Sequence, residues 1–233
     1  MKKLIRNIIN LISIDTPYFI IINYIKNYFP NYRKKKECLK IEKNIYSNFK
    51  SEDISKKWFT NNLYFIKKNL ANTKIKYLLE IGSYEGRSAL FFLDLFKITK
   101  ISCVDTWSGS DEHKDINFHA IENNFDLNTK SFKEKKTLLK FKMTSDEFFK
   151  QNKNKFDFIY VDGDHAKDQV YKDLINSWSI LNSNGFLLID DYMWWYFKDL
   201  KKNPASAVNS FINKYFDQVR KIVIWHQVLL QKK

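Results

Sequence analysis

Cysteine is scarce in this chain, which has two in 233 residues, Cys38 and Cys103. The two cysteines do not suggest a disulfide framework, and no Cys-x-x-Cys pair or cluster of cysteine and histidine is present that would indicate a zinc site. Cys103 stands inside an apolar run and is expected to pack as a small hydrophobic residue. This usage is typical of the reducing cytoplasm, where we expect the protein to act.

Long apolar runs are also missing. A membrane-spanning helix needs about 20 apolar residues, and the run Tyr18–Ile22 is far shorter. The start of the chain resembles the beginning of a signal peptide, but Arg6, Asn7 and Asn10 interrupt its apolar part and no small-residue cleavage site follows. We therefore expect neither a membrane span nor a cleaved secretory signal.

Negative charge is in short supply. The chain has 40 Lys and Arg against 26 Asp and Glu, a net charge of +14, and residues 1–50 hold 11 basic and 3 acidic residues, or +8. A basic balance favours acidic partners such as nucleic acid, anionic lipid or a phosphorylated substrate, although heavy use of Lys, Asn and Ile raises the pI without any such function. For residues 1–50 three roles stay open: peripheral contact with a membrane, a helical cap over an active site, or a contact between subunits of an oligomer.

The chain does have enough apolar residues for a folded core. Hydrophobic residues make up 44% of it, which suits one α/β domain and a small extension. We expect the extension, made of basic helices, at residues 1–53 and the domain at residues 54–233, with a helix within residues 54–71. Strand patterns alternate with helical ones along the domain, which predicts a mostly parallel sheet.

Glycine is rare, with five in the chain, and two of the five share one stretch. The apolar run Tyr77–Ile81, which carries the single acid Glu80, is followed by Gly82 and Gly86 and then by a helical apolar pattern. This order predicts a strand, a tight glycine turn and a helix. Such a turn lets the backbone approach a ligand closely and aims helix N–H groups at it; an ordinary strand-to-helix turn is the plainer interpretation.

A second acid stands at the spacing that a nucleoside site requires. Asp105 ends the next apolar strand, 23 residues after Gly82, and in dinucleotide-type folds an acid about 20 residues after the glycine turn accepts hydrogen bonds from ribose hydroxyls. Capping of a turn is the alternative role for Asp105. After the third expected strand, Thr144–Glu147 have the pattern of a capping box, and a polar residue there either caps the helix or, as Ser145 would, faces an adenine.

Acidic residues also follow the fourth and fifth expected strands. The fourth apolar run ends in Asp162, Asp164 and His165, and the fifth ends in the pair Asp190–Asp191. In open α/β sheets the ligand crevice lies at the carboxyl ends of the strands, so these groups are expected to share one site. Carboxyl groups that converge on a cleft repel one another unless a cation joins them.

Taken together, these stretches resemble the motifs of class I S-adenosylmethionine-dependent methyltransferases: Glu80–Gly86, Asp105, Phe156–His165 and Gly185–Tyr192. The likeness spans about residues 54–233 and is nearest to small bacterial enzymes with a Glu-Ile-Gly-Ser-x-Glu-Gly-Arg-Ser motif. It implies a Rossmann-like, doubly wound sheet of seven strands, mostly parallel with an antiparallel last strand. It also implies S-adenosylmethionine as the cofactor, with its methionine end over Gly82 and its ribose on Asp105. The implied cofactor-binding residues are Glu80, Gly82, Ser83, Gly86, Asp105, Thr106, Ser145 and Asp162.

The acids further resemble those of metal-dependent O-methyltransferases of the catechol and macrolide-sugar types. In those enzymes one acid follows the fourth strand and an acidic pair, or an acid and an amide, follows the fifth; here Asp162 and Asp190–Asp191 occupy those places, 28 residues apart. The resemblance implies that the three acids hold Mg²⁺ or another divalent cation, which binds the acceptor and lowers the pKa of its hydroxyl. The alternative is that some of these acids cap backbone groups or bind the cofactor amine.

His165 has its own role in this resemblance. A similarly placed histidine is a proposed general base in the sugar-modifying relatives, and the ordinary pKa of histidine, about 6.5, suits that role. His165 and Asp162 are therefore candidate catalytic residues. Asp164 is the competing base, and a purely local hydrogen bond is the alternative for His165.

We expect the protein to O-methylate a hydroxyl of a sugar or other small polyol, so that its partner is a small-molecule or glycan acceptor. Three tryptophans just beyond acid-bearing strand ends are suited to stack on such an acceptor: Trp107, Trp194 and Trp195. The second hypothesis makes RNA the acceptor because residues 1–50 are basic, although no RNA-binding motif is present and the acidic site argues against nucleic acid. The third is a non-catalytic protein that docks to a membrane through residues 1–50 and keeps a relic cofactor pocket.

Overall fold

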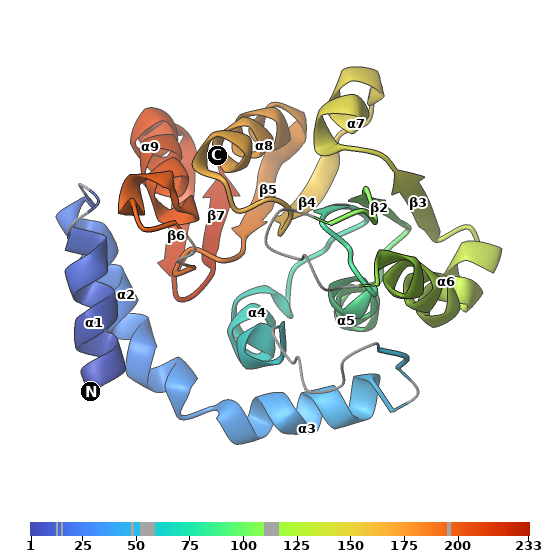
Figure 1. Ribbon diagram of the computed structural model, residues 1–233, viewed down its shortest axis with the longest axis horizontal. Helices are drawn as coiled ribbons and strands as arrows, with labels where there is room; N and C mark the ends of the chain where they lie inside the picture. Colours follow the sequence, from blue (N-terminus) through green and yellow to red (C-terminus); the bar gives the residue numbers. More distant parts are fainter. Residues whose placement is uncertain (13, 15, 48, 52–58, 110–116, 195–196) are drawn as a thin grey trace. The chain divides into compact units, whose positions relative to one another are not determined.

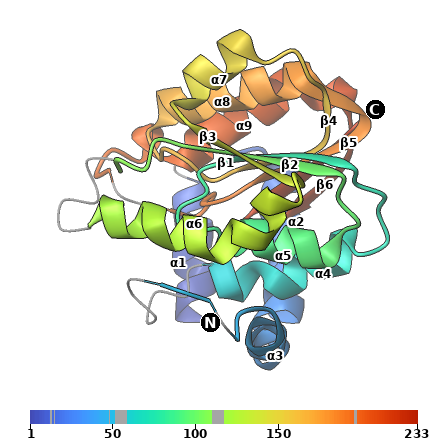
Figure 2. The ribbon, with the colours of Figure 1, turned by 90° about the vertical axis from the view of Figure 1, so that its right-hand side faces the viewer.

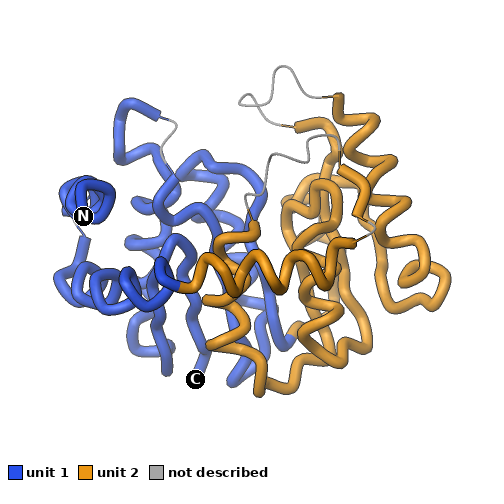
Figure 3. Tube along the Cα trace, turned by 90° about the horizontal axis from the view of Figure 1, so that it is seen from below, with its two compact units in different colours: residues 1–33, 157–233 blue, residues 34–156 orange. Residues whose placement is uncertain are grey.

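A computed structural model of the chain describes residues 1–12, 14, 16–47, 49–51, 59–109, 117–194 and 197–233. These residues form two compact units, shown in separate colours in Figure 3. One unit consists of residues 34–156, and the other combines residues 1–33 with residues 157–233. The first 33 residues therefore pack with the C-terminal part of the chain.

The unit of residues 34–156 is built on three parallel strands. Its elements are α3 (Lys35–Ile45), η1 (Phe59–Asn62), α4 (Leu63–Leu70), β1 (Tyr77–Ile81), α5 (Arg87–Leu95), β2 (Lys100–Asp105), α6 (Phe118–Glu134), β3 (Leu138–Lys142) and α7 (Ser145–Gln151). β1 pairs with β2 in the register Leu79 to Ser102, and β2 pairs with β3 in the register Cys103 to Lys140. Figure 2 shows α4, α5 and α6 on one face of these strands and α7 on the other.

The core of this unit is rich in aliphatic residues and phenylalanine. Leu78, Leu79 and Ile81 of β1 are buried, as expected for the continuous apolar run of a parallel strand. Phe91 and Phe92 of α5 are also buried. Burying one such side chain contributes about 1.5–3 kcal/mol, so this packing holds α5 in place after the glycine turn.

The unit of residues 1–33 and 157–233 contains the other four described strands. Its elements are α1 (Lys2–Ile12), α2 (Tyr18–Tyr32), β4 (Phe156–Val161), α8 (Lys167–Ile180), β5 (Leu181–Ile189), η2 (Leu200–Lys202), α9 (Pro204–Tyr215), η3 (Phe216–Gln218), β6 (Val219–Ile224) and β7 (Val228–Lys232). β7 runs antiparallel to both β5 and β6, with Leu188 opposite Leu229 and Ile222 opposite Leu230. Figure 2 shows α8 and α9 on one face of these strands.

Helix α2 attaches to the edge strand β6 through one asparagine. The Asn23 side chain donates from Nδ2 to Ile222 O at 3.0 Å and accepts at Oδ1 from Ile224 N at 3.0 Å. It therefore occupies backbone groups that an edge strand otherwise leaves open to another chain. Helix α1 in turn packs on α2, where Asn7 Nδ2 donates to the Tyr24 hydroxyl at 2.7 Å.

The strands follow the order β3-β2-β1-β4-β5-β7-β6. The expected mostly parallel, Rossmann-like sheet of seven strands with an antiparallel last strand is confirmed, and so are helices in the basic N-terminal segment. The helix expected within residues 54–71 covers Leu63–Leu70, while residues 54–58 lie outside the described part of the chain. The expected domain boundary at residue 53 stays a prediction. None of the described helices is long and apolar enough to cross a membrane.

Candidate functional site

The glycine turn after β1 has the backbone shape that its sequence predicts. Gly82 and Gly86 both have a φ of 84°, in the left-handed region that other residues disfavour. Gly86 also caps α5, and a Cβ there would lie 3.1 Å from Thr129 Cγ2 and 3.2 Å from Phe125 Cδ2. Backbone conformation and close packing against α6 therefore both select glycine at position 86.

Asp105, at the end of β2, holds this turn through backbone hydrogen bonds. Its Oδ2 accepts from Ser83 N and Tyr84 N, both at 2.9 Å, and its Oδ1 accepts from Trp107 N at 2.7 Å. The Trp107 indole Nε1 in turn donates to Tyr84 O at 2.8 Å. A carboxylate accepts about four hydrogen bonds, so this capping role leaves room for the ribose role predicted for Asp105.

Glu80, the acid of β1, is fully buried. Among the described residues, neither of its carboxylate oxygens makes a well-formed hydrogen bond, and neither does the Ser83 hydroxyl. Burial raises the pKa of Glu80 to about 7, while the nearby hydroxyls of Ser88 and Ser83 oppose that rise. Burying a charged acid without a well-formed hydrogen bond destabilises the folded state, and a cationic group bound at the turn would reduce this destabilisation.

Two further residues predicted to contact the cofactor, Thr106 and Ser145, lie in segments that contain local hydrogen bonds. The Thr106 hydroxyl accepts from Ser108 N at 3.3 Å, within the loop after β2. Ser145 is the first residue of α7, and the capping box before it is formed by Thr144 and Glu147. The structure thus contains the predicted capping box, and contact of Thr106 or Ser145 with a cofactor stays a prediction.

In the other unit, three side chains converge beyond β4 and β5. Ligand atoms of Asp162, His165 and Asp191 all lie within 4.8 Å of one another, and His165 Nε2 is 2.8 Å from Asp191 Oδ2. Asp191 has a φ of 52°, a left-handed conformation that costs a non-glycine residue about 1–3 kcal/mol and tends to occur at functional sites. We call these three residues the acid–histidine cluster.

Asp190, the third predicted metal ligand, is bonded differently. Its Oδ2 accepts from the Tyr160 hydroxyl and, at 2.7 Å, from Gln227 Nε2, and its Oδ1 accepts from Asp191 N at 2.8 Å. Desolvation, and after it the charge of Asp191, raise the pKa of Asp190 above its usual range. This geometry favours Asp190 as a support for its neighbours, and its role as a metal ligand stays a prediction.

Tyr160 and Gln227 are residues that the sequence analysis missed. The Tyr160 hydroxyl lies 2.9 Å from Asp162 Oδ2 and also within hydrogen-bond distance of Asp190 Oδ2. The period-two pattern of a strand directs Tyr160 and Asp162 to the same side of β4, which is a signal that would have identified the tyrosine. Gln227 lies in the turn between β6 and β7 and is fully buried. Nothing in its local sequence marks it.

Asp164, the competing base, has a local role. It is exposed, and its Oδ1 accepts from Ala166 N at 2.7 Å just before α8. An acid before a helix commonly caps it in this way. The structure thus places His165, rather than Asp164, against a second carboxylate.

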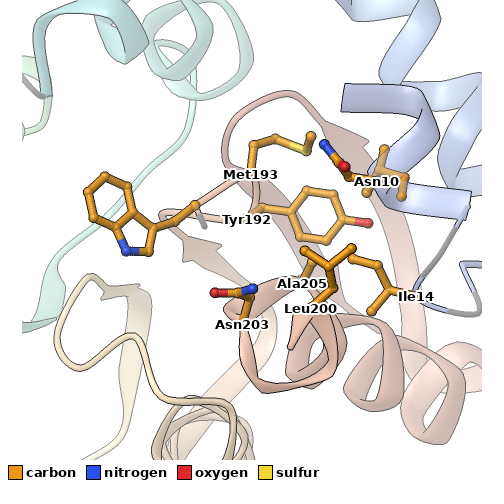
Figure 4. Close-up of a pocket in the computed structure, with 9 residues that line it drawn as sticks. Asn10, Ile14, Tyr192, Met193, Leu200, Asn203 and Ala205 are labelled. Atoms are coloured by element: carbon orange, nitrogen blue, oxygen red, sulfur yellow. The ribbon is translucent and has the colours of Figure 1, made fainter. Parts of the chain in front are cut away.

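A small pocket lies between α1 and the segment that follows β5 (Figure 4). Its volume of about 10 Å³ is enough for one water molecule. It is lined by Asn10, Leu11, Ile14, Tyr192, Met193, Trp194, Leu200, Asn203 and Ala205. Trp194 connects this pocket to the acid–histidine cluster, because its ring centroid is 5.3 Å from that of His165. Of the other predicted acceptor-stacking residues, Trp107 is buried in the unit of residues 34–156, and Trp195 lies outside the described residues.

One protein-family model matches a segment that includes both the glycine turn and the acid–histidine cluster. Residues 79–192 match a family model described as a methyltransferase domain. This segment is a methyltransferase domain. It includes Glu80, the glycine turn, Asp105 and the whole acid–histidine cluster. The recognition of a class I S-adenosylmethionine-dependent methyltransferase from the sequence is confirmed, while the nearer likeness to enzymes with a Glu-Ile-Gly-Ser-x-Glu-Gly-Arg-Ser motif stays a prediction.

Solved structures share the fold of this chain. An O-methyltransferase from Bacillus cereus, in complex with SAH, aligns over 86% of this chain and 91% of its own, with 12% identity and a TM-score of 0.53. The O-methyltransferase TomG from Streptomyces achromogenes, in complex with SAM, aligns over 84% and 89%, with 9% identity and a TM-score of 0.55. MycE, a methyltransferase of the mycinamycin pathway solved with Mg and SAH, aligns over 84% of this chain and 54% of its own, with 13% identity and a TM-score of 0.52. None of the curated proteins matches the sequence.

Proposed function

We propose that this methyltransferase transfers a methyl group from S-adenosylmethionine to a hydroxyl of a sugar or other small polyol, assisted by a divalent cation. The observation that carries the proposal is the acid–histidine cluster, in which Asp162, His165 and Asp191 bring ligand atoms within 4.8 Å of one another. The likeness to MycE supports the choice of chemistry, because that methyltransferase was solved with Mg, SAH and mycinamycin VI.

The unit of residues 34–156 fits the donor. Glu80 offers a buried carboxylate that makes no well-formed hydrogen bond among the described residues, which suits the ammonium group of the cofactor. Asp105 fixes the turn of Gly82 and keeps a lone pair for a ribose hydroxyl. When bound, S-adenosylmethionine supplies a methyl group on a sulfonium. The residues of this unit would bind the cofactor and fix the orientation of that group.

The acid–histidine cluster fits a divalent cation. Carboxylate oxygens and water are the ligands that Mg²⁺ and Mn²⁺ prefer. Asp162 and Asp191 would supply the oxygen ligands, in agreement with the prediction for these two acids. A cation there also offsets the repulsion between the acids, and when bound it lowers the pKa of the acceptor hydroxyl.

His165 takes the acceptor proton in this proposal. Its Nε2 lies 2.8 Å from Asp191 Oδ2, and a carboxylate in that position orients the imidazole and stabilises its protonated form. The hydroxyl proton passes to Nδ1 of His165 while the acceptor oxygen takes the methyl group. The Trp194 ring beside His165 offers an apolar face on which a sugar can stack.

A methyl-transfer assay with labelled S-adenosylmethionine tests the proposal. Free sugars, nucleotide sugars, polyols and RNA are supplied as acceptors, with Mg²⁺ or with EDTA. We expect label in a sugar or polyol, and a loss of roughly a hundredfold on adding EDTA or on replacing Asp191→Asn. Asp199→Asn is the matched control, since this exposed acid of the same unit only caps Lys201 N. Label in RNA alone, or full activity of Asp191→Asn in EDTA, would contradict the proposal.

A second variant separates the two roles open to the histidine. If His165 is the base, His165→Ala lowers kcat and leaves the affinity for Mn²⁺ close to that of the wild type. If His165 is chiefly a metal ligand, the affinity for Mn²⁺ falls by roughly ten- to a hundredfold. Calorimetric titration of Mn²⁺ into both proteins measures the difference, and the second result would assign the proton transfer to another group.

A further inference from the structure

Helix α1 exposes an apolar stripe to solvent. Leu4 and Leu11 are buried, whereas Ile5, Ile9 and Ile12 are 51%, 59% and 60% exposed. Positions i, i+4 and i+7 lie on one side of a helix, so the three isoleucines form a single outer stripe. An amphipathic helix ordinarily turns such a stripe toward the core, and α1 has a second one facing out.

Helix α2 repeats this arrangement with aromatic residues. Ile20 and Tyr24 are buried, whereas Tyr18, Phe29 and Tyr32 are 76%, 45% and 64% exposed. Phe29 and Tyr32 follow Tyr18 by about three and four helical turns, which keeps the three exposed rings on the same side of α2. This outer stripe also includes Ile25.

Residues 1–33 hold most of the exposed large apolar side chains that the structure describes. Of fourteen such side chains in the described part of the chain, nine lie within these residues. Helices α1 and α2 lie side by side (Figure 1) and are joined by the Asn7–Tyr24 hydrogen bond. Exposed apolar surface gathered in one region marks an interaction site. We call it the α1–α2 surface, and it consists of Ile5, Ile9, Ile12, Tyr18, Ile25, Phe29 and Tyr32.

Positive charge borders the α1–α2 surface. Residues 1–33 contain five basic residues and one acid, and all five basic side chains are exposed: Lys2, Lys3, Arg6, Lys26 and Arg33. Helical spacing puts Lys2 and Arg6 next to the stripe of α1, and Lys26 and Arg33 next to that of α2. A symmetric dimer would set this positive surface against itself, so the charge argues for an anionic partner rather than a second copy of the chain.

We propose that the α1–α2 surface binds the surface of an anionic membrane, with both helices in the plane of the interface. The isoleucines enter the boundary between headgroups and acyl chains, and the tyrosine hydroxyls stay at the level of the headgroups. The lysines and arginines contact lipid phosphates. Such a partner uses both properties of the surface, whereas a nucleic acid would use the charge and leave the apolar stripes unoccupied. This binding does not depend on the proposed methyl transfer.

Co-sedimentation of the full chain with lipid vesicles tests the proposal. We expect binding to phosphatidylcholine vesicles that contain phosphatidylglycerol to be at least about tenfold tighter than binding to pure phosphatidylcholine vesicles. The preference is expected to shrink as the salt concentration rises from about 0.1 M to 0.5 M. The double variant Lys2→Gln/Lys3→Gln is expected to lose affinity only for the anionic vesicles.

A matched pair of variants distinguishes binding through this surface from nonspecific adsorption to the vesicles. Ile5→Ser/Ile9→Ser is expected to bind anionic vesicles about tenfold more weakly, because two apolar side chains no longer enter the lipid. Leu127→Ser, at a position 61% exposed on α6, is expected to bind as the wild type does. Circular dichroism checks that each variant is folded; if the serine variant is not, the lysine variant decides.

Three results would overturn the proposal. The first is a wild-type chain that does not sediment with anionic vesicles. The second is an equal loss of binding in Leu127→Ser and in the surface variants. The third is a dimer in analytical ultracentrifugation that the Ile5→Ser/Ile9→Ser variant abolishes, which would assign the surface to self-association.

Discussion

The two units hold their acids by different means. In the unit of residues 34–156, Asp105 accepts hydrogen bonds from three backbone N–H groups, so a main-chain turn is built around one carboxylate. In the unit of residues 1–33 and 157–233, most contacts to the acids come from side chains, those of Tyr160, His165 and Gln227, and fewer come from backbone N–H groups. A turn held through the main chain is marked in the sequence by glycines and an acid at a fixed spacing, whereas contacts between side chains follow no such pattern.

The largest effect is expected for Asp105, in the unit of residues 34–156. Asp105→Asn leaves one acceptor oxygen and sets an NH₂ group against a backbone N–H. We therefore expect the free energy of unfolding to fall by about 4 kcal/mol, and the binding of S-adenosylmethionine to be lost. Urea unfolding and calorimetric titration measure the two effects. Asp94→Asn, exposed on α5, is the control, and equal stability of the two variants would show that the turn does not depend on Asp105.

The next effect concerns the buried acid of the same unit. Burial raises the pKa of Glu80 from 4.5 to about 7. Because the folded pKa lies above the unfolded one, Glu80 makes the folded state less stable as the pH rises from about 4.5 to 7, with no further loss above that range. Glu80→Gln is thus expected to be about 3 kcal/mol more stable than the wild type at pH 8 and equal to it near pH 4.

Urea unfolding at the two pH values checks this prediction, and a calorimetric titration adds the functional side. We expect Glu80→Gln to bind S-adenosylmethionine more weakly despite its greater stability at pH 8, because the amide carries no charge for the ammonium group. A stability difference that is the same at both pH values would show that the titration of Glu80 is not the cause.

The turn held by Asp105 could be predicted from the sequence because its determinants form a recognisable pattern of residues and spacing. The strand, the turn of Gly82 and Gly86, and the spacing to Asp105 are all visible as residue patterns, and the alternation of strands and helices fixed the fold class. In the other unit the same reasoning found the acids but not their arrangement. Tyr160 and Gln227 meet Asp190 from positions 30 and 37 residues away. The left-handed backbone of Asp191 decides where that acid lies. It could not be predicted, because the usual sequence signal for such a conformation is a glycine.

A smaller effect is expected for Tyr160, in the unit of residues 1–33 and 157–233. Tyr160→Phe removes the hydroxyl between Asp162 and Asp190 but keeps the ring that fills the core. We expect the affinity for Mn²⁺ and kcat to fall by about ten- to a hundredfold, with the far-ultraviolet circular dichroism unchanged. Tyr171→Phe on α8 is the control. Unchanged Mn²⁺ affinity in Tyr160→Phe would show that the hydroxyl does not position the acids.

The smallest effects are expected at the two tryptophans, and they compare the units directly. Trp194→Ala removes the ring beside His165, so we expect KM for the acceptor to rise by about three- to tenfold while kcat is largely kept. Trp107→Phe removes the hydrogen bond to Tyr84 O, so we expect a loss of about 1 kcal/mol in stability and a higher KM for S-adenosylmethionine. Steady-state kinetics with each substrate varied in turn separates the two outcomes. If both variants changed the KM of the same substrate, the assignment of donor to one unit and acceptor to the other would be wrong.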